Sequence, residues 1–255
     1  MIVPVLGLLT LTLVAWVGAG IGIWLGALSP KRLELLVHAA TGVVLGITLF
    51  DILPEAKGVL PWRAFLPAVV GGYALLWAVG KFVYHVCPSC AIAHFDGDSP
   101  PADRRNLTLL AVALGVHCAL DGVAVVAGGG LGTKAEIGLL MGLCMHKLPE
   151  GLALGLLLLG AGVSRRLAMT RAVAIESLTA IGGLLSIAFI GGADRGLLGA
   201  TFAIVGGGFL YLVVNAVSGA LGRHMRMSRL RTIATQCVSC AGTGAFLWLL
   251  YRCGA

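Results

Sequence analysis

Charged side chains are scarce in this sequence. Asp, Glu, Lys and Arg make up only 11% of its 255 residues, and Phe, Trp and Tyr only 7%. A soluble domain normally has about a quarter charged residues. With 58% hydrophobic residues, the composition argues against a water-soluble fold and makes lipid the expected solvent.

Motifs for nucleotide hydrolysis and for zinc-peptidase chemistry are also missing. The chain contains no P-loop and no HExxH sequence, and its apolar stretches leave no room for a sizeable soluble domain. We therefore expect no enzyme and no organic cofactor, and any transport should follow ion gradients rather than ATP hydrolysis.

Long apolar stretches dominate what remains. A membrane-spanning helix needs about 20 mainly apolar residues. Hydropathy marks eight such stretches, at roughly 3–26, 35–54, 64–84, 107–128, 135–159, 172–191, 197–220 and 232–251. The first is too long and too weakly flanked by basic residues for a cleaved signal peptide. We predict an all-α polytopic membrane bundle of about eight transmembrane helices, with residues 1–255 forming a single domain.

The formal net charge of +7 could indicate a nucleic-acid partner, but the positions of the basic residues favour membrane topology. Twelve of the eighteen Lys and Arg residues lie at the end of the first, third, fifth and seventh stretches or follow them. The positive-inside rule places these connections in the cytoplasm and both termini outside it. We expect an integral protein of a bacterial plasma (inner) membrane with no nucleic-acid partner; a homodimer is left open.

The longest connection, at about 85–106, contains candidate metal ligands. His85, Cys87, Cys90 and His94 combine imidazole and thiol groups at short spacing, which permits zinc capture. A CxxC pair also serves redox roles, and an ordinary polar linker is a further alternative. A disulfide framework is not expected on the cytoplasmic side of a membrane.

Two matched pairs of ionisable residues lie inside apolar stretches. His117 precedes Asp121 by four residues, and His146 precedes Glu150 by four, so each pair lies about one helical turn apart on one face. A charge at the bilayer centre costs about 2.5–3.5 kcal/mol. Two imidazoles and two carboxylates suit Zn²⁺, and also Fe²⁺, Mn²⁺, Co²⁺ or Cd²⁺. The alternative is a histidine that only hydrogen-bonds neighbouring helices.

Other polar residues accompany these pairs. Pro149 cannot donate to the carbonyl of Met145, and a helix broken at membrane depth usually lines a cavity. Asp51 and Glu55 flank a proline at the end of the second stretch and could form an outer vestibule for cations. Glu176 either lies beside the site or snorkels to the cytoplasmic boundary.

These residues carry a family resemblance. The sequence HKLPEG from His146 to Gly151, HCALDG from His117 to Gly122 and GITLFDILPE from Gly46 to Glu55 resemble the ZIP (Zrt/Irt-like) metal transporters. The fourth helix of that family typically reads H-N-x-x-D-G and its fifth H-x-x-P-E-G. The eight stretches, outward termini and ligand-rich connection are similar as well, so the resemblance covers the whole chain.

The resemblance implies transport toward the cytoplasm and a central, often binuclear, metal site. Carried onto this sequence, the first position would use His117, Asp121, His146 and Glu150, and the second would use residues 118, 121, 147, 150 and 176. This sequence departs from the family pattern at two of these positions, Cys118 and Lys147. We hypothesise that the Lys147 ammonium takes the second metal's place and pairs with Glu150 or Glu176.

The expected function is therefore transport of a divalent transition metal. Zinc is the first candidate and would be a substrate rather than a cofactor; iron, manganese, cobalt and cadmium remain possible. Alternating access, in which the site-bearing helices shift against the rest of the bundle, is the expected mechanism. The main alternative is a membrane metal sensor or receptor that binds without translocating, and a membrane-embedded zinc hydrolase comes third.

Overall fold

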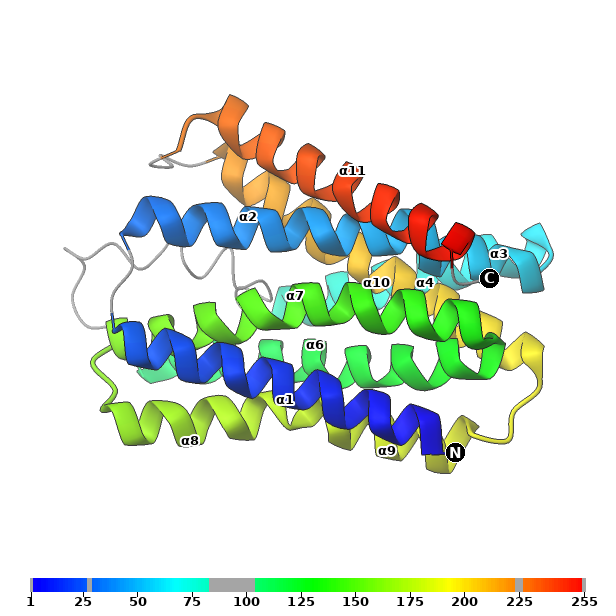
Figure 1. The fold of residues 1–255 in the computed structure, drawn as a ribbon, viewed down its shortest axis with the longest axis horizontal. Coiled ribbons are helices and arrows are strands. Elements are labelled where there is room, and N and C mark those ends of the chain that lie inside the picture. Colours follow the sequence, from blue (N-terminus) through cyan, green and yellow to red (C-terminus); the bar gives the residue numbers. More distant parts are fainter. Residues whose placement is uncertain (1, 27–28, 83–103, 223–226, 254–255) are drawn as a thin grey trace.

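A computed structural model describes residues 2–26, 29–82, 104–222 and 227–253, and every regular element in these ranges is helical (Figure 1). Eight segments are long and apolar enough to cross a membrane. The predicted all-helical bundle of eight spans is confirmed, and the chain is a membrane protein. The helices are α1 (Ile2–Leu25), α2 (Pro30–Ile47), η1 (Thr48–Ile52), α3 (Leu53–Val59), α4 (Trp62–Phe82), α6 (Arg104–Leu131), α7 (Thr133–Gly160), α8 (Arg165–Glu176), α9 (Leu178–Ile190), α10 (Arg195–Gly222) and α11 (Arg229–Cys253).

Two of the spans are interrupted helices. The second span runs through α2, the π-helical turn η1 and α3. Pro54, at the start of α3, has no N–H and its ring clashes with the carbonyl four residues earlier, so the helix widens just before it. The sixth span breaks between α8 and α9, where the Ser177 hydroxyl donates to the carbonyl of Val173 at 2.5 Å. Such a bond bends helices.

The expectation of a broken helix at Pro149 is wrong. Helix α7 runs without interruption from Thr133 to Gly160, with Pro149 inside it. A membrane helix tolerates an internal proline where neighbouring groups and small local adjustments satisfy the freed carbonyl. The polar centre of the bundle is therefore built between continuous helices.

The helices form two halves (Figure 1). In the first, which we call the α6–α7 half, α1 packs on α7 and α6 packs on α9, with α8 beside α1. In the second, the α2–α10 half, α4 packs on α10 and α2 packs on α11, and this half includes η1 and α3. The two halves meet mainly where α2 faces α7 and where α10 faces α6.

Within each half, helix backbones touch directly. A Cβ atom added at Gly18 or Gly151 would collide with the carbonyl oxygens of Leu148 and Ala15, on the facing helices of the α1–α7 pair. In the other half, a Cβ at Gly207 would collide with the carbonyl oxygen of Val69 on α4. Small residues that let helix backbones approach closely are a common means of association in lipid.

Between the halves, large apolar side chains separate the backbones. Ile47 of α2 fits against Gly142 of α7, and Phe202 and Phe209 of α10 are fully buried in the main apolar core. The ring of Phe202 lies over Gly128 of α6. The junction between the halves is thus formed by side chains, most of them apolar, whereas helix backbones meet directly within each half.

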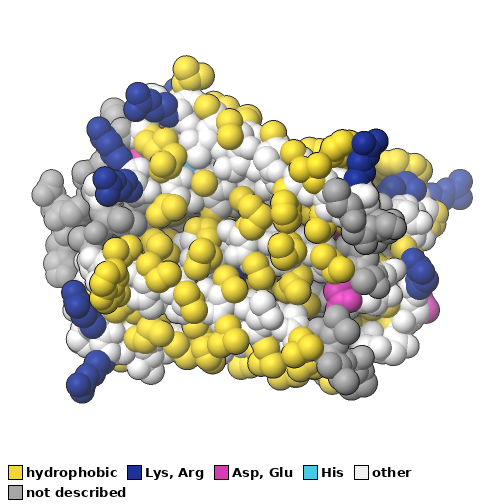
Figure 2. Space-filling model, in the orientation of Figure 1, with side chains coloured by type: hydrophobic (Ala, Val, Ile, Leu, Met, Phe, Trp, Pro, Cys, Tyr) yellow, Lys and Arg dark blue, Asp and Glu magenta, His cyan; other side chains and the backbone are white. Residues whose placement is uncertain are grey.

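The surface is that of a membrane protein. Figure 2 shows hydrophobic side chains over the middle of the molecule and Lys and Arg side chains toward its two ends. The start of α1 and the end of α11 lie at the same end of the bundle (Figure 1). The structure does not assign that end to a side of the membrane, so extracytoplasmic termini stay a prediction.

Candidate metal centre

Two neighbouring helices supply most of the polar centre. Helix α6 presents His117 and Asp121, and α7 presents His146, Lys147 and Glu150. None of these five residues is more than 9% exposed, and Asp121 and Lys147 are 0% exposed. Buried charges must be paired or metal-bound, so their mutual geometry decides what the centre can do.

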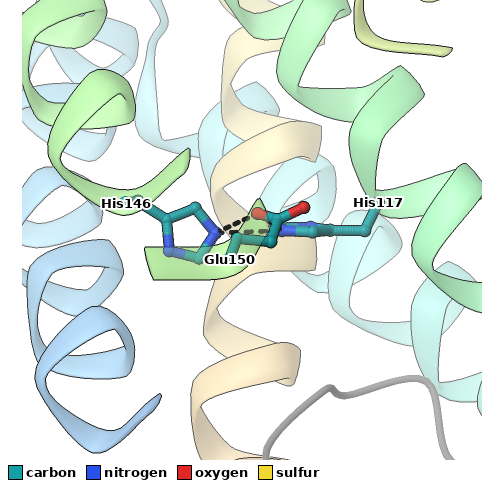
Figure 3. A group of neighbouring side chains, drawn as sticks. All are labelled: His117, His146 and Glu150. Carbon is teal, nitrogen blue, oxygen red and sulfur yellow. Dashed lines mark hydrogen bonds and ion pairs between the residues drawn. The ribbon is translucent and has the colours of Figure 1, made fainter. Parts of the chain in front are cut away.

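Three donor atoms of this centre converge on one point. His146 Nε2 lies 2.7 Å from Glu150 Oε2, His117 Nε2 lies 3.3 Å from the same oxygen, and the two Nε2 atoms are 3.1 Å apart. Figure 3 shows the two imidazoles approaching from opposite sides with the Glu150 carboxylate between them. The three groups belong to two helices of the same half.

These spacings fit a transition-metal ion. Zinc bonds of about 2.0–2.1 Å to nitrogen and oxygen set neighbouring tetrahedral ligands about 3.3 Å apart. The three observed separations run from 2.7 to 3.3 Å, so a small relaxation would seat an ion among His117, His146 and Glu150. Two imidazoles and one carboxylate leave a fourth position for water or another ligand.

Lys147 forms ion pairs with three acids of the centre. Its Nζ lies 2.8 Å from Asp121 Oδ2, 2.8 Å from Glu150 Oε1 and 3.4 Å from Glu176 Oε2. Asp121 Oδ2 is 3.8 Å from His117 Nε2, farther than Glu150 is. Asp121 therefore faces the lysine more closely than the histidine with which sequence spacing paired it.

Cys118 and Glu176 also belong to this lysine-centred group. The Cys118 thiol lies 3.2 Å from Lys147 Nζ, 3.4 Å from Glu150 Oε1 and 3.5 Å from Glu176 Oε2. Glu176, the last residue of α8, is 0% exposed, so the alternative that it snorkels to the membrane boundary is wrong. Lys147 contacts both Glu150 and Glu176, so the hypothesis that it pairs with one of these acids is confirmed for both.

The Glu150 carboxylate connects the two groups. Its Oε2 faces the histidines and its Oε1 faces Lys147. The Nδ1 atoms of His117 and His146, the second oxygens of Asp121 and Glu176, and the hydroxyl of Thr179 make no hydrogen bond among the described residues. The centre is a polar interior whose pairing is incomplete.

Asp51 does not belong to the centre. It lies in η1, is 1% exposed, and its Oδ1 accepts a hydrogen bond from the Tyr251 hydroxyl of α11. A Cβ added at Gly138 of α7 would meet both partners. Because Gly138, Gly142 and His146 follow one another at four-residue intervals, Asp51 faces the same stripe of α7 that leads to the candidate ligands.

The predicted loop ligands His85, Cys87, Cys90 and His94 lie outside the described residues.

Sequence reasoning missed a third pairing of an acid with a histidine. Glu34 and His38 of α2, again four residues apart, are 8% and 1% exposed. Glu34 Oε2 accepts a bond of 3.0 Å from the Met227 backbone N–H, and His38 Nδ1 lies 3.3 Å from Gln236 Nε2 of α11. A search for an acid four residues before a histidine, the reverse of the order used above, would have identified Glu34 and His38. Tyr251 had no such signal.

No protein-family model and no curated protein matches the chain. The site itself is therefore the evidence on function. Eight apolar spans around buried histidine, glutamate and cysteine groups are compatible with a membrane metal-binding protein.

Proposed function

We propose that the protein moves a divalent transition metal across a membrane, with zinc as the first candidate. The observation that supports this most is the convergence of His117, His146 and Glu150 on one buried point between two membrane helices. Ionisable residues inside membrane spans are costly, and they usually mark pathways for ions or substrates.

The donor set supports a transition metal over the abundant alkaline-earth ions. Imidazole nitrogen suits zinc, iron, nickel and copper, whereas calcium takes six to eight oxygens. With two nitrogens and one oxygen, the centre suits zinc well. Iron, manganese, cobalt and cadmium remain alternative substrates, because ligand type narrows the metal without fixing it.

The position of the centre supports transport over sensing. His117 stacks edge-on against Phe209 of α10, with ring centroids 5.9 Å apart, so the candidate ligands of the α6–α7 half lie against the α2–α10 half. In transporters, a site where two bodies of the fold meet can be exposed to either side as one body shifts against the other. A junction formed by side chains rather than by direct backbone contact would permit such a shift.

The ZIP resemblance is part of the same proposal. The sequences HCALDG and HKLPEG, on which it rests, contribute all three converging side chains. As a ZIP-like transporter in a bacterial inner membrane, the protein would carry the ion toward the cytoplasm. A metal sensor that binds without translocating remains the second candidate.

Uptake of radioactive zinc into proteoliposomes tests the proposal. The unmutated protein should give saturable uptake, and the double variant His146→Ala, Glu150→Ala should reduce it to the level of empty liposomes. Competing divalent metals would rank the substrates. Zinc binding without uptake, by protein shown to be folded and inserted, would contradict transport and favour the sensor.

A further inference from the structure

Lys147 lies where a second metal ion would be expected. Cys118, Glu150 and Glu176 form a second group whose donor atoms all lie within 4.8 Å of one another. The Lys147 Nζ is within 3.4 Å of a donor atom from each of these residues, and it is 2.8 Å from Asp121 Oδ2. The ammonium thus sits among four donor atoms.

The chemistry of an ammonium matches this environment. It offers three N–H donors and no acceptor, and its hydrogen bonds to charged oxygens run to about 2.7–2.9 Å. The two contacts of 2.8 Å, to Asp121 and Glu150, have this length. A metal would need the same atoms at about 2.0–2.3 Å, so lysine and metal cannot share the group.

The charge of the centre leads to the same conclusion. Asp121, Glu150 and Glu176 supply three negative charges when ionised, and Lys147 supplies one positive charge. Two negative charges remain, which one divalent ion neutralises. A second ion would leave the centre doubly positive in a region of low dielectric, where uncompensated charge is costly.

From this geometry we propose that Lys147 is a built-in cation that fills the second ligand group, so that the centre binds one divalent ion. The inference rests on the proposed metal centre and specifies its capacity. In this arrangement Asp121, Cys118 and Glu176 hold Lys147 in place. The residues His117, His146 and Glu150 bind the transported ion.

Binding stoichiometry tests this inference apart from transport. The full chain would be purified with Ser in place of Cys87, Cys90, Cys237 and Cys240, so that neither CxxC pair contributes a thiol. Zinc bound per chain would be measured by equilibrium dialysis and metal analysis. Cobalt would then be titrated, because a Co²⁺–thiolate bond gives a near-ultraviolet charge-transfer band and so reports on Cys118.

With Lys147 present, we expect one zinc per chain and no cobalt–thiolate band. Lys147→Met should raise the count to two and produce the band, and adding Cys118→Ser should remove the band again. Two ions or a thiolate band with Lys147 present would overturn the inference, even if Lys147→Met fails to fold. One ion in folded Lys147→Met would overturn it as well.

The variant His146→Ala separates this inference from the proposed centre. If it still binds one zinc with unchanged affinity, the ion is held elsewhere and the proposed centre fails. If His146→Ala loses the ion and the unmutated protein shows no uptake, the proposal of transport is wrong. The inference that the centre binds one ion is then unaffected.

Discussion

The two halves of the molecule use the same sequence spacing for different purposes. In the α6–α7 half, His146 and Glu150 lie four residues apart and point their Nε2 and Oε2 atoms toward His117. In the α2–α10 half, Glu34 and His38 have the same spacing, but they bond to the Met227 backbone and to Gln236. The first pair converges with a third donor, whereas the second ties α2 to the start and body of α11.

This difference shows what a metal centre requires beyond spacing. One turn of helix puts two side chains on one face, but a site needs a second helix to bring further donors to the same point. Helix α6 does this for α7. Glu34 and His38 bond instead to the Met227 backbone and to Gln236 of α11, and no group of metal ligands among the described residues includes them.

The largest effect is expected from a pair of histidine variants, one in each half. We expect His146→Ala to weaken zinc binding at least about 100-fold, the upper end of what the loss of even a supporting residue costs. His38→Ala should change zinc affinity less than about threefold and instead lower the thermal stability, because a buried bond to Gln236 is lost. Isothermal titration with zinc and thermal unfolding would measure both. Equal losses of affinity would contradict the different roles.

The second prediction concerns the junction between the halves. The Cβ of Ile47 lies 3.6 Å from a Cβ built at Gly142, within the about 3.5–4.5 Å that a disulfide needs. Oxidation of Ile47→Cys, Gly142→Cys should therefore link α2 to α7. If the halves move against each other, zinc uptake should fall at least about tenfold and return on reduction, as expected when a gating step is blocked.

A link inside one half serves as the control for this experiment. A Cβ at Gly199 of α10 lies 3.2 Å from the Cβ of Val59 of α3, which is in the same half. This is slightly closer than a disulfide needs, so cross-linking of the pair would be verified by gel shift before uptake is measured. Cross-linked Val59→Cys, Gly199→Cys should keep its uptake. Both pairs would be made in a background in which Ser replaces Cys87, Cys90, Cys237 and Cys240. Full uptake through the linked Ile47–Gly142 pair would contradict movement at this junction.

The third prediction compares two glycines of α7. Gly151→Ala places a methyl group against the carbonyl of Ala15, which cannot move aside, whereas Gly142→Ala meets only the side chain of Ile47. We expect Gly151→Ala to cost about 1–3 kcal/mol, as overpacking usually does, and Gly142→Ala to cost less. Thermal unfolding in detergent would rank the two; a larger loss at Gly142 would mean that the junction between the halves is the tighter one.

Much of the fold could be predicted from the sequence, because lipid leaves few choices. Eight apolar stretches become eight spans, since every backbone polar group in the bilayer must be satisfied within a helix. The interruptions were harder to predict. Pro149 leaves α7 continuous, while the helix widens before Pro54 and breaks after Glu176, because neighbouring packing decides how a helix accommodates a local defect.

The sequence predicted which residues form the candidate site, but it predicted less well which of them contact one another. The four-residue spacing predicted His117, Asp121, His146 and Glu150 as site residues, and in the structure these four side chains lie close together. Spacing could not reveal that Asp121 turns mainly to Lys147, because that choice depends on the angle between α6 and α7 and on the approach of α8.

The smallest expected effect is at Asp51, which faces the same stripe of α7 outside the centre. Asp51→Asn keeps a hydrogen-bond acceptor for the Tyr251 hydroxyl and removes a negative charge from the predicted vestibule. We expect the zinc concentration for half-maximal uptake to rise about threefold, with maximal uptake unchanged, as when a charge only attracts the ion. An unchanged half-maximal concentration would remove Asp51 from the path.

Anomalous X-ray diffraction from crystals of the zinc-loaded protein would locate and count the bound ions in one experiment. We expect a single peak in the centre, bounded by His117 Nε2, His146 Nε2 and a Glu150 oxygen, with Lys147 still among Asp121, Glu150 and Glu176. A centre without zinc, or a zinc peak at the position of the Lys147 ammonium, would contradict it.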